Sequence, residues 1–306
     1  RGLKLKVLHT FRAVAERGSM TKAADQLALP PSAITKVIGD MEALLGVSLL
    51  DRTPHGVVPM AYGAALLDGS TNLFDELKQT VERIELLADP TLGEVRIGAA
   101  EAWMGTVVPA AIDRLARQNA GMVFRVLHAN APAELIGWLR ARAIDGFVSR
   151  GHPAPEEDID REALFDDPLV VVAGQGSPLF RGGVVNLTQL VNEAWCMPVE
   201  PHPIGILIAQ AFQANGLSLP RVRVSCASMS LQASLAATGR YLTVMPMSYL
   251  RFRADKDSLR IVPVDLNVTS PPVYLATLKH RRISPAAKLF IETLRAVAKE
   301  AMESKD

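Results

Sequence analysis

Cysteine is scarce in this chain, and long apolar runs are missing. Only Cys196 and Cys226 occur among 306 residues, so a scaffold built on several disulfides is excluded. No uninterrupted apolar run approaches the ~20 residues that span a bilayer. Residues 1–30 are mixed and amphipathic, unlike a secretion signal. We therefore expect a soluble, cytoplasmic protein that has no contact with a membrane.

Motifs for catalysis and for metal or cofactor binding are also missing. The sequence has no Gly-x-Ser-x-Gly elbow, no phosphate-binding loop and no dinucleotide fingerprint. None of the six histidines pairs with another at metal-ligand spacing. Apolar neighbours surround Cys196 and Cys226, which favours inert thiols, with a redox switch as the weaker alternative. We therefore expect no metal, no cofactor and no enzymatic activity.

Net charge is small, +1 over the whole chain, but it is unevenly distributed. Residues 1–60 hold eight Lys or Arg against five Asp or Glu, which leaves +3. Residues 61–88 hold two basic residues against five acidic ones, which leaves −3. A basic excess confined to one end of the chain is where a surface for nucleic acid is expected.

Three helices are predicted between residues 3 and 45, because apolar residues recur there at three- and four-residue steps. Gly18 ends the first helix, and Ser19 or Thr21 can cap the second. The third begins near Pro31 and ends at Gly46. Its polar face carries Ser32, Thr35, Lys36, Gly39 and Asp40. A slender polar face of this kind fits the major groove of DNA.

A β-hairpin is predicted between residues 47 and 60. Two short apolar segments flank the turn-rich sequence Arg52-Thr53-Pro54-His55-Gly56. Arg52 and His55 would let this wing lie on phosphate or reach a minor groove. The helices, the polar face and the wing follow the order of a winged DNA-binding domain. A small helical subdomain with an ordinary solvated face is the alternative.

Residues 61–88 contain no proline and are predicted to form one helix, ~40 Å long at 1.5 Å per residue. An apolar stripe close to heptad spacing runs along this helix, with Leu66, Leu73, Leu77, Val81, Ile84 and Ala88. We favour a dimer interface, because a two-fold dimer matches a pseudo-palindromic operator. A connector packed on its own chain is the alternative. Asp89-Pro90 ends the helix.

Short apolar strands alternate with helices after Gly93. Strands are predicted at 94–99, 122–128, 144–148 and 168–173, and helices at 106–118 and 133–143. This alternation is typical of parallel sheets covered by helices on both faces. Because the region is about twice as long as one such unit, two lobes are expected.

The segment FRAVAERGSMTKAADQLALPPSAITKVIGDMEALLGVSLLDRTPHGVVPMAYGAALL resembles the N-terminal domain of LysR-type transcriptional regulators, almost without gaps. Two positions depart from the family pattern. Pro31 stands where Gln is usual and has no amide to pair with adenine, and Lys36 replaces the usual Arg. The DNA-binding residues expected from the pattern and the resemblance are Ser19, Thr21, Pro31, Ser32, Thr35, Lys36, Arg52 and His55.

The segments GEVRIGAAEAW, LIGWLRARAIDGFVSRG, LFDDPLVVVAGQGSPL and LAATGRYLTVMP are similar to successive parts of the family's effector domain. The resemblance implies an all-α winged helix-turn-helix head (1–60), a linker and dimerisation helix (61–90), and an α/β two-lobed effector-binding domain (91–306) like the periplasmic binding proteins. Lobe I would comprise 91–166 and 268–306, and lobe II 167–267. Two crossing strands, near Asp166-Asp167 and Leu266-Asn267, would form the hinge.

A ligand cleft is expected where strands end, because ligands of open α/β sheets bind there against helix N-termini that attract anions. The candidate effector-binding residues are Ala100, Glu101, Trp103, His128, Asn130, Arg150, Glu200, His202, Ser228 and Met229. A small organic acid is the expected ligand, with Trp103 as a flat apolar wall. Glu101 and Glu200 oppose an anion unless each pairs with a basic side chain. A ligand with hydroxyls or a positive charge is therefore the alternative.

We therefore predict a bacterial transcriptional regulator that binds double-stranded DNA as a homodimer and is modulated by a small-molecule effector between the lobes. A homotetramer is a further expectation, and RNA polymerase is a further candidate partner. The rival hypothesis is a solute-binding or enzymatic α/β protein whose helical N-terminus does not bind DNA. A regulator that responds to no ligand is the third hypothesis.

Overall fold

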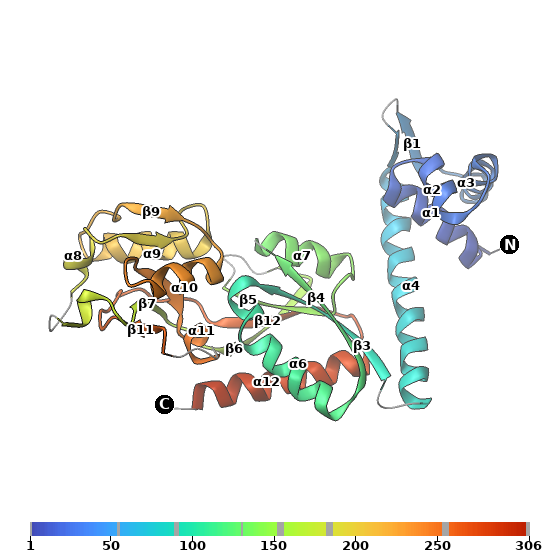
Figure 1. Ribbon diagram of the computed structural model, residues 1–306. Coiled ribbons are helices and arrows are strands. Elements are labelled where there is room, and N and C mark those ends of the chain that lie inside the picture. Colours follow the sequence, from blue (N-terminus) through green and yellow to red (C-terminus); the bar gives the residue numbers. More distant parts are fainter. Residues whose placement is uncertain are drawn as a thin grey trace. The chain divides into compact units, whose positions relative to one another are not determined.

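The computed structural model of the chain describes residues 2–53, 56–88, 92–129, 131–151, 156–181, 186–252 and 257–303. The chain divides into two compact units, Arg1–Ile84 and Glu85–Asp306, and each is described by itself (Figure 1). No helix within the described ranges is both long enough and apolar enough to cross a membrane.

The first unit begins with a helical head made of α1 (Leu5–Arg17), α2 (Met20–Leu27) and α3 (Pro31–Leu45). Gly18 and Gly46 follow the ends of α1 and α3, as predicted, and both adopt the left-handed conformation. Ser19 caps α2 by accepting a hydrogen bond from the Lys22 amide at 3.3 Å. The buried core beneath these helices includes Phe11, Val14, Ile34, Ile38, Met41 and Leu49.

The predicted hairpin consists of β1 (Leu50–Thr53) and β2 (Gly56–Pro59), paired antiparallel, and is followed by α4 (Ala61–Ala88). The Val57 amide donates a hydrogen bond to the Gly18 carbonyl at 2.8 Å, which ties the wing to the end of α1. A Cβ at Gly63 would lie 2.0 Å from the Leu49 carbonyl oxygen. The close approach of α4 to the base of the wing therefore requires glycine at position 63.

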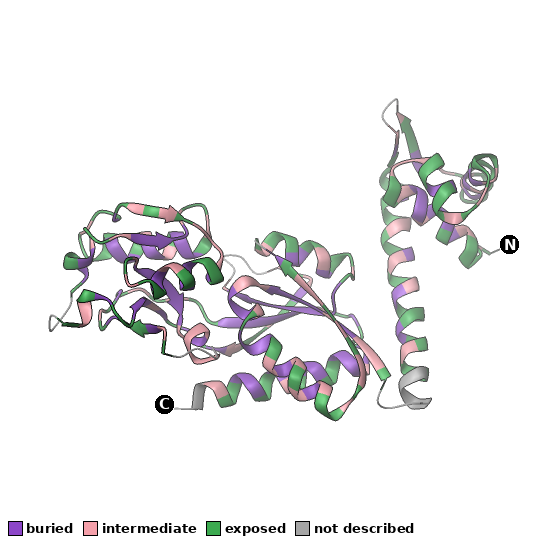
Figure 2. Ribbon diagram, viewed as in Figure 1, coloured by how far each residue is buried: buried purple, intermediate pink, exposed green. Residues whose placement is uncertain are grey.

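The apolar side chains of α4 fall into two groups. Leu66 and Leu67 pack against the core of the head. Further along the helix, Figure 2 shows exposed residues on α4. Leu73, Leu77, Val81 and Ile84 form the apolar exposed set and are between 45% and 61% exposed. Leu66 thus differs from Leu73, Leu77, Val81 and Ile84 of the predicted stripe, because the head of its own chain already partly covers it, and the side chain of Ala88 lies outside the described part of the chain.

Lobe I of the second unit is built on a five-stranded sheet of order β4-β3-β5-β12-β6. Its strands are β3 (Leu92–Ala100), β4 (Gly121–Ala129), β5 (Gly146–Arg150), β6 (Ile159–Phe165) and β12 (Val273–Leu278). The helices of this lobe are α5 (Glu101–Met104), α6 (Val107–Gln118), α7 (Pro132–Arg140) and α12 (Pro285–Glu303).

The expectation of purely parallel sheets is wrong for lobe I. β3 pairs with β4 and β5 in parallel, but β12 pairs antiparallel with both β5 and β6. The reason is the route of the chain. β6 leaves the sheet at Phe165, and β12 enters beside it, with Val273 paired to Phe165 and Arg150. β12 begins at the end of the sheet where β5 and β6 finish, so it must run antiparallel to both.

Lobe II is built on β7 (Leu169–Gly174), with β10 (Thr243–Pro246) and β11 (Leu259–Ile261) antiparallel on either side. β8 (Trp195–Met197) and β9 (Val222–Ser225) pair in parallel, and a single bridge joins Trp195 to Leu242. Lobe II therefore has a wholly antiparallel three-stranded sheet and a separate parallel pair, so the expectation of parallel sheets is wrong for the three-stranded sheet as well. The helical elements of this part of the chain are η1 (Pro178–Arg181), α8 (Leu187–Leu190), α9 (Pro203–Ala214), α10 (Met229–Ala237) and α11 (Met247–Phe252).

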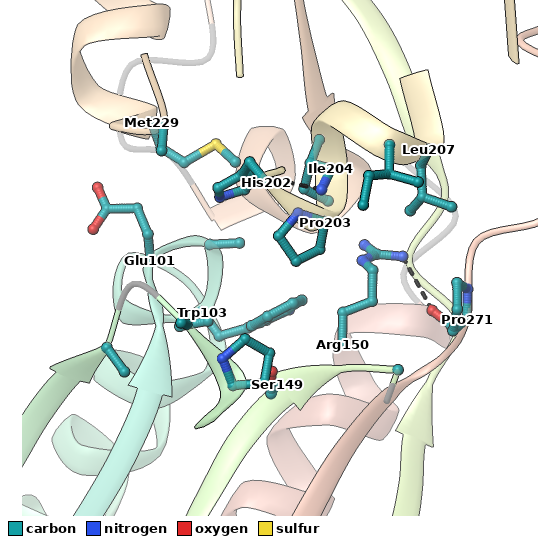
Figure 3. A pocket seen from close by; sticks show the side chains of 18 of the residues that line it. Glu101, Trp103, Ser149, Arg150, His202, Pro203, Ile204, Leu207, Met229 and Pro271 are labelled. Atoms are coloured by element: carbon teal, nitrogen blue, oxygen red, sulfur yellow. Dashed lines mark hydrogen bonds between the residues drawn. The ribbon is translucent and has the colours of Figure 1, made fainter. Parts of the chain in front are cut away.

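The chain crosses between the lobes twice, in residues 166–168 and 262–272, and neither crossing is a strand. The prediction of two crossing strands is therefore wrong, because the strands β6, β7, β11 and β12 all end or begin outside these two segments. Side chains hold the crossings instead. Asp167 accepts hydrogen bonds from the Ser248 amide and hydroxyl at 2.8 and 2.7 Å. The Ser270 hydroxyl donates to the Asp167 carbonyl at 3.3 Å, and Arg150 donates to the Pro271 carbonyl at 3.2 Å (Figure 3).

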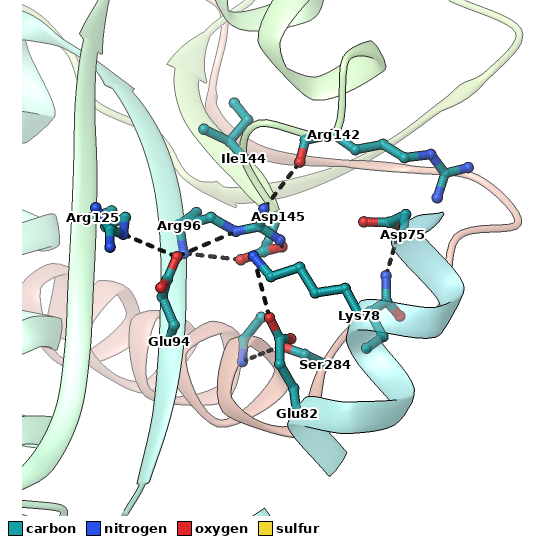
Figure 4. A network of polar contacts seen from close by, with 12 residues as sticks. Asp75, Lys78, Glu82, Glu94, Arg96, Arg125, Arg142, Ile144, Asp145 and Ser284 are labelled. Atoms are coloured by element: carbon teal, nitrogen blue, oxygen red, sulfur yellow. Dashed lines mark hydrogen bonds and ion pairs between the residues drawn. The ribbon is translucent and has the colours of Figure 1, made fainter. Parts of the chain in front are cut away.

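A buried polar network lies at the amino end of β5, away from the crossings (Figure 4). The Asp145 carboxylate accepts hydrogen bonds from the Arg96 amide at 2.9 Å and the Arg96 guanidinium at 2.8 Å. It also accepts one from Arg281 at 3.2 Å, and Arg281 donates to the Ile144 carbonyl at 2.7 Å. One carboxylate therefore joins β3, the start of β5 and the segment after β12.

Replacing Asp145 with Asn should lower the free energy of unfolding of the second unit by about 3 kcal/mol, because two largely buried guanidinium groups lose their carboxylate. Urea denaturation followed by circular dichroism measures this loss. The matched control is Glu162→Gln, which removes a half-exposed carboxylate that also pairs with an arginine, Arg295, and should cost about 0.5 kcal/mol. Equal losses in the two variants would show that burial does not determine how much an ion pair contributes to the free energy of unfolding.

Candidate functional site

The exposed face of α3 collects most of the residues expected to contact DNA. Pro31, Ser32, Thr35 and Lys36 are all exposed, while Ile34 and Ile38 on the other face are buried. The Thr35 hydroxyl donates a hydrogen bond to the Pro31 carbonyl at 3.0 Å, so its oxygen remains able to accept one. Thr21 is exposed at the start of α2, and Ser19 is half-buried at its cap.

The wing presents Arg52, which is exposed on β1, whereas His55 lies outside the described residues. Glu42 was not among the predicted functional residues. Its Oε1 accepts hydrogen bonds from the Leu49 amide at 2.7 Å and the Leu50 amide at 3.3 Å. The carboxylate of α3 thus orients the first strand of the wing. A glutamate near the end of a helix is too common a pattern to indicate this role.

In the second unit, a cleft of about 580 Å³ is lined by both lobes (Figure 3). It is within the usual size of small-molecule sites. The predicted residues that line it are Ala100, Glu101, Trp103, His128, Arg150, His202, Ser228 and Met229. Glu200 is not part of the lining, and Asn130 lies outside the described residues. Lining residues that sequence reasoning missed include Ser149, Ile204, Leu207, Gln210 and Pro271.

Strand ends and helix starts bring these residues together. The carboxyl ends of β3, β4 and β5 supply the lobe I side, and the first turns of α9 and α10 supply the lobe II side. His202 caps α9 because its Nδ1 accepts a hydrogen bond from the Ile204 amide at 3.2 Å, and Ser228 caps α10. Burial lowers the pKa of His202, so its imidazole is neutral near pH 7 and carries its proton on Nε2.

The ionic groups of the cleft are few. Glu101 pairs with His128, with Oε2 and Nε2 3.2 Å apart. Arg150 lies only 5.7 Å from the centre of the Trp103 ring and is 7% exposed. Burial lowers the pKa of the Arg150 guanidinium, and the carboxylate of Asp167 opposes this shift.

Of the two cysteines, Cys196 is buried, as expected for an inert thiol, whereas Cys226 is only partly buried. Cys196 is fully buried, and burial, with a smaller contribution from Cys226, raises the pKa of its thiol to about 11. In the described part of the chain, no group of three or more His, Cys, Asp or Glu side chains could hold a metal ion.

Two family models match the sequence. The model of the LysR substrate binding domain matches residues 88–299, and that of the bacterial regulatory helix-turn-helix protein, lysR family, matches residues 5–64. Regulators of this family are not enzymes. The helix-turn-helix match removes the rival hypothesis of an α/β protein with an unrelated helical N-terminus.

Similar proteins extend over nearly the whole chain. The transcriptional regulator PcaQ of Agrobacterium fabrum is 26% identical over 304 residues, which cover 99% of this chain and 97% of PcaQ. The regulator GbpR of Azospirillum brasilense is also 26% identical, over 98% of this chain and 88% of its own.

Two solved structures share the fold. A full-length OxyR variant from Pseudomonas aeruginosa has a TM-score of 0.66 and 18% identity over 98% of this chain and 95% of its own. Full-length CbnR in complex with its target DNA has a TM-score of 0.55 and 21% identity over 97% of this chain and 100% of its own. The matches to both family models, together with this fold, show that the chain belongs to the LysR family of DNA-binding transcriptional regulators, with an N-terminal helix-turn-helix and an effector-binding domain.

Proposed function

We propose that the protein binds DNA as a homodimer and that a small organic acid in the cleft of the second unit changes this binding. The observation that carries the proposal is the convergence of side chains from both lobes, distant in sequence, on one cleft of ligand size. The proposed division is a DNA-binding head (1–60), a dimerisation helix (61–90) and an effector domain (91–306).

The proposed DNA contacts are made by the exposed face of α3 and by the wing. Ser32 and Thr35 are short enough to reach base edges, and Lys36 supplies a positive charge for phosphate or guanine. Ser19, Thr21 and Pro31 would lie beside the duplex, and Arg52 and His55 would contact the backbone or the minor groove. Because Lys36 is a point charge rather than a planar fork, its contribution should be mostly independent of base sequence.

The proposed dimer interface is the exposed part of α4, with Leu73, Leu77, Val81 and Ile84. Four large apolar side chains on one face of a helix are costly in water, and a second copy of the same helix would bury them. Two heads on one dimer would then contact two half-sites of an operator. The tetramer, RNA polymerase as a partner and a location with the DNA in the cytoplasm remain predictions from the sequence.

A ligand between the lobes can act only by binding one arrangement of the lobes better than another. The crossings at 166–168 and 262–272 are the segments in which such a change would occur. A changed relation between the lobes would alter how the subunits pack, and so the spacing or bend of the bound DNA.

Lys36→Ala should reduce the slope of log affinity against log salt by about 1, because one phosphate contact is lost. Fluorescence anisotropy measures this with a duplex that the wild-type protein has selected from a random library. Lys288→Ala, an exposed lysine on α12, is the control and should leave the slope unchanged. An unaltered slope in the Lys36 variant would remove this residue from the interface.

Leu77→Glu should weaken dimerisation by about tenfold or more, because a carboxylate would be buried among apolar side chains. Sedimentation velocity over a range of protein concentrations measures this. Arg83→Glu adds the same acidic side chain to an exposed site beside the stripe, so it serves as the control. Dimers of equal strength in the two variants would mean that the interface lies elsewhere.

The effector proposal is tested by thermal-shift screening of small carboxylic acids, followed by DNA footprinting. A ligand that binds only the folded protein raises its melting temperature, and the footprint should change when it is added. His202→Asn keeps a capping side chain on α9 but removes the imidazole, and it should reduce the shift. His280→Asn, at an exposed position away from the cleft, should not. Identical footprints with and without a stabilising ligand would reject the proposal.

A further inference from the structure

Arg150 is buried at the edge of the cleft with part of its hydrogen-bonding capacity unused. Nη1 donates to the Pro271 carbonyl at 3.2 Å. Nη2 approaches Asp167 Oδ2 at 3.4 Å, but within the described part of the chain neither Nη2 nor Nε has a hydrogen-bond partner. Only 7% of the residue is exposed, so bulk water does not replace these partners.

The two unused nitrogens have a specific geometry. Nε and Nη2 form one edge of the planar guanidinium, and the N–H bonds along this edge match the two oxygens of a carboxylate. Asp167 does not fill the edge, because its Oδ2 stays 3.4 Å from Nη2 and no hydrogen bond to Nε or Nη2 is made within the described residues, while both of its oxygens accept hydrogen bonds from Ser248. A buried guanidinium cannot lose its charge near pH 7, so its unused donors carry a cost that an anionic ligand would relieve.

The surroundings of Arg150 are mostly apolar. The lining includes Trp103, Pro203, Ile204, Leu207, Met229 and Pro271. Figure 3 shows the Arg150 side chain projecting from the end of β5 toward Pro203 and Leu207. Glu101 lies well apart from Arg150 in this view, with Trp103 and Pro203 between them. A second carboxylate at the Glu101 side would therefore meet a like charge.

We propose that Arg150 binds the carboxylate of the effector through Nε and Nη2, and that the effector is a monocarboxylate with an aromatic or aliphatic body. This inference rests on the proposed function, since it names the ligand class of the same cleft. The body of the ligand packs on Trp103 and the apolar first turn of α9. A hydroxyl group at the end of the ligand opposite the carboxylate would donate a hydrogen bond to Glu101.

The same guanidinium links the ligand to the crossings between the lobes. Arg150 contacts Asp167 in the first crossing and Pro271 in the second. A carboxylate on the Nε and Nη2 edge competes with Asp167 for Nη2. The ligand thus changes contacts that Arg150 makes with both segments that join the lobes. Its binding energy therefore differs between arrangements of the lobes, as a ligand-driven rearrangement requires.

The first test compares acids with their neutral amides on the wild-type full-length protein. Benzoate and 3-phenylpropanoate should raise the melting temperature at millimolar concentration, whereas benzamide and 3-phenylpropanamide should not, because an uncharged amide presents only one acceptor oxygen to the guanidinium. Equal shifts from acid and amide would overturn the assignment of Arg150.

The second test measures affinity for the stabilising acid by isothermal titration calorimetry. Arg150→Met keeps the length of the side chain and should weaken binding by roughly 10- to 100-fold, and Arg150→Lys should restore part of the loss. Asp167→Asn removes the competing carboxylate and should leave binding equal or tighter. Arg295→Met, on the exposed face of α12, is the control.

The outcomes separate the two proposals. Unchanged acid binding in Arg150→Met, or weaker binding in Asp167→Asn, would overturn the role of Arg150. If Arg150→Met does not fold, the comparison of acid and amide and the Asp167 variant still decide. If none of the four compounds stabilises the wild-type protein, the monocarboxylate class is wrong. The proposed function fails separately, when no ligand of the wider screen alters the footprint.

Discussion

The effector domain depends on one constraint: the chain leaves lobe I and returns to it at the same edge of one sheet. β6 ends at Phe165, β12 begins at Val273, and the two residues pair with each other. The parallel strands β3, β4 and β5 end at this edge too, so their loops, the crossings and the cleft coincide. Arg150, the last residue of β5, is therefore adjacent both to the cleft and to the segments that join the lobes.

A shared core limits how the lobes can move. One hydrophobic cluster contains Val148 and Phe165 of lobe I together with Val172, Met229 and Met245 of lobe II. Close-packed interiors do not deform continuously, so a change in the relation of the lobes must repack these side chains as a discrete step. Met229 lines the cleft and also belongs to this cluster. A ligand in the cleft thus contacts a residue of the core that any rearrangement would repack.

Much of the fold was predictable because its determinants are local. Apolar periodicity, Gly18 and Gly46 as helix ends, and the turn-rich segment of the wing each act over a few residues, and the helices and hairpin that they predict are present. The errors concern partners distant in the sequence. The antiparallel direction of β12 and the irregular crossings depend on where lobe II is inserted, and Glu42 acquires its role only because the wing folds back onto α3.

Periodicity, caps and strand ends are properties of neighbouring residues, so they were enough to predict the helix-turn-helix, the wing, the long helix and most segments that line the cleft. No local pattern indicates that Leu66 packs in the head, that Pro271 reaches the cleft, or that two nitrogens of Arg150 lack hydrogen-bond partners among the described residues. Burial and hydrogen-bond saturation depend on which distant segments meet in the folded chain. The sequence shows that an arginine is present, but not which hydrogen-bond partners its guanidinium has in the folded protein.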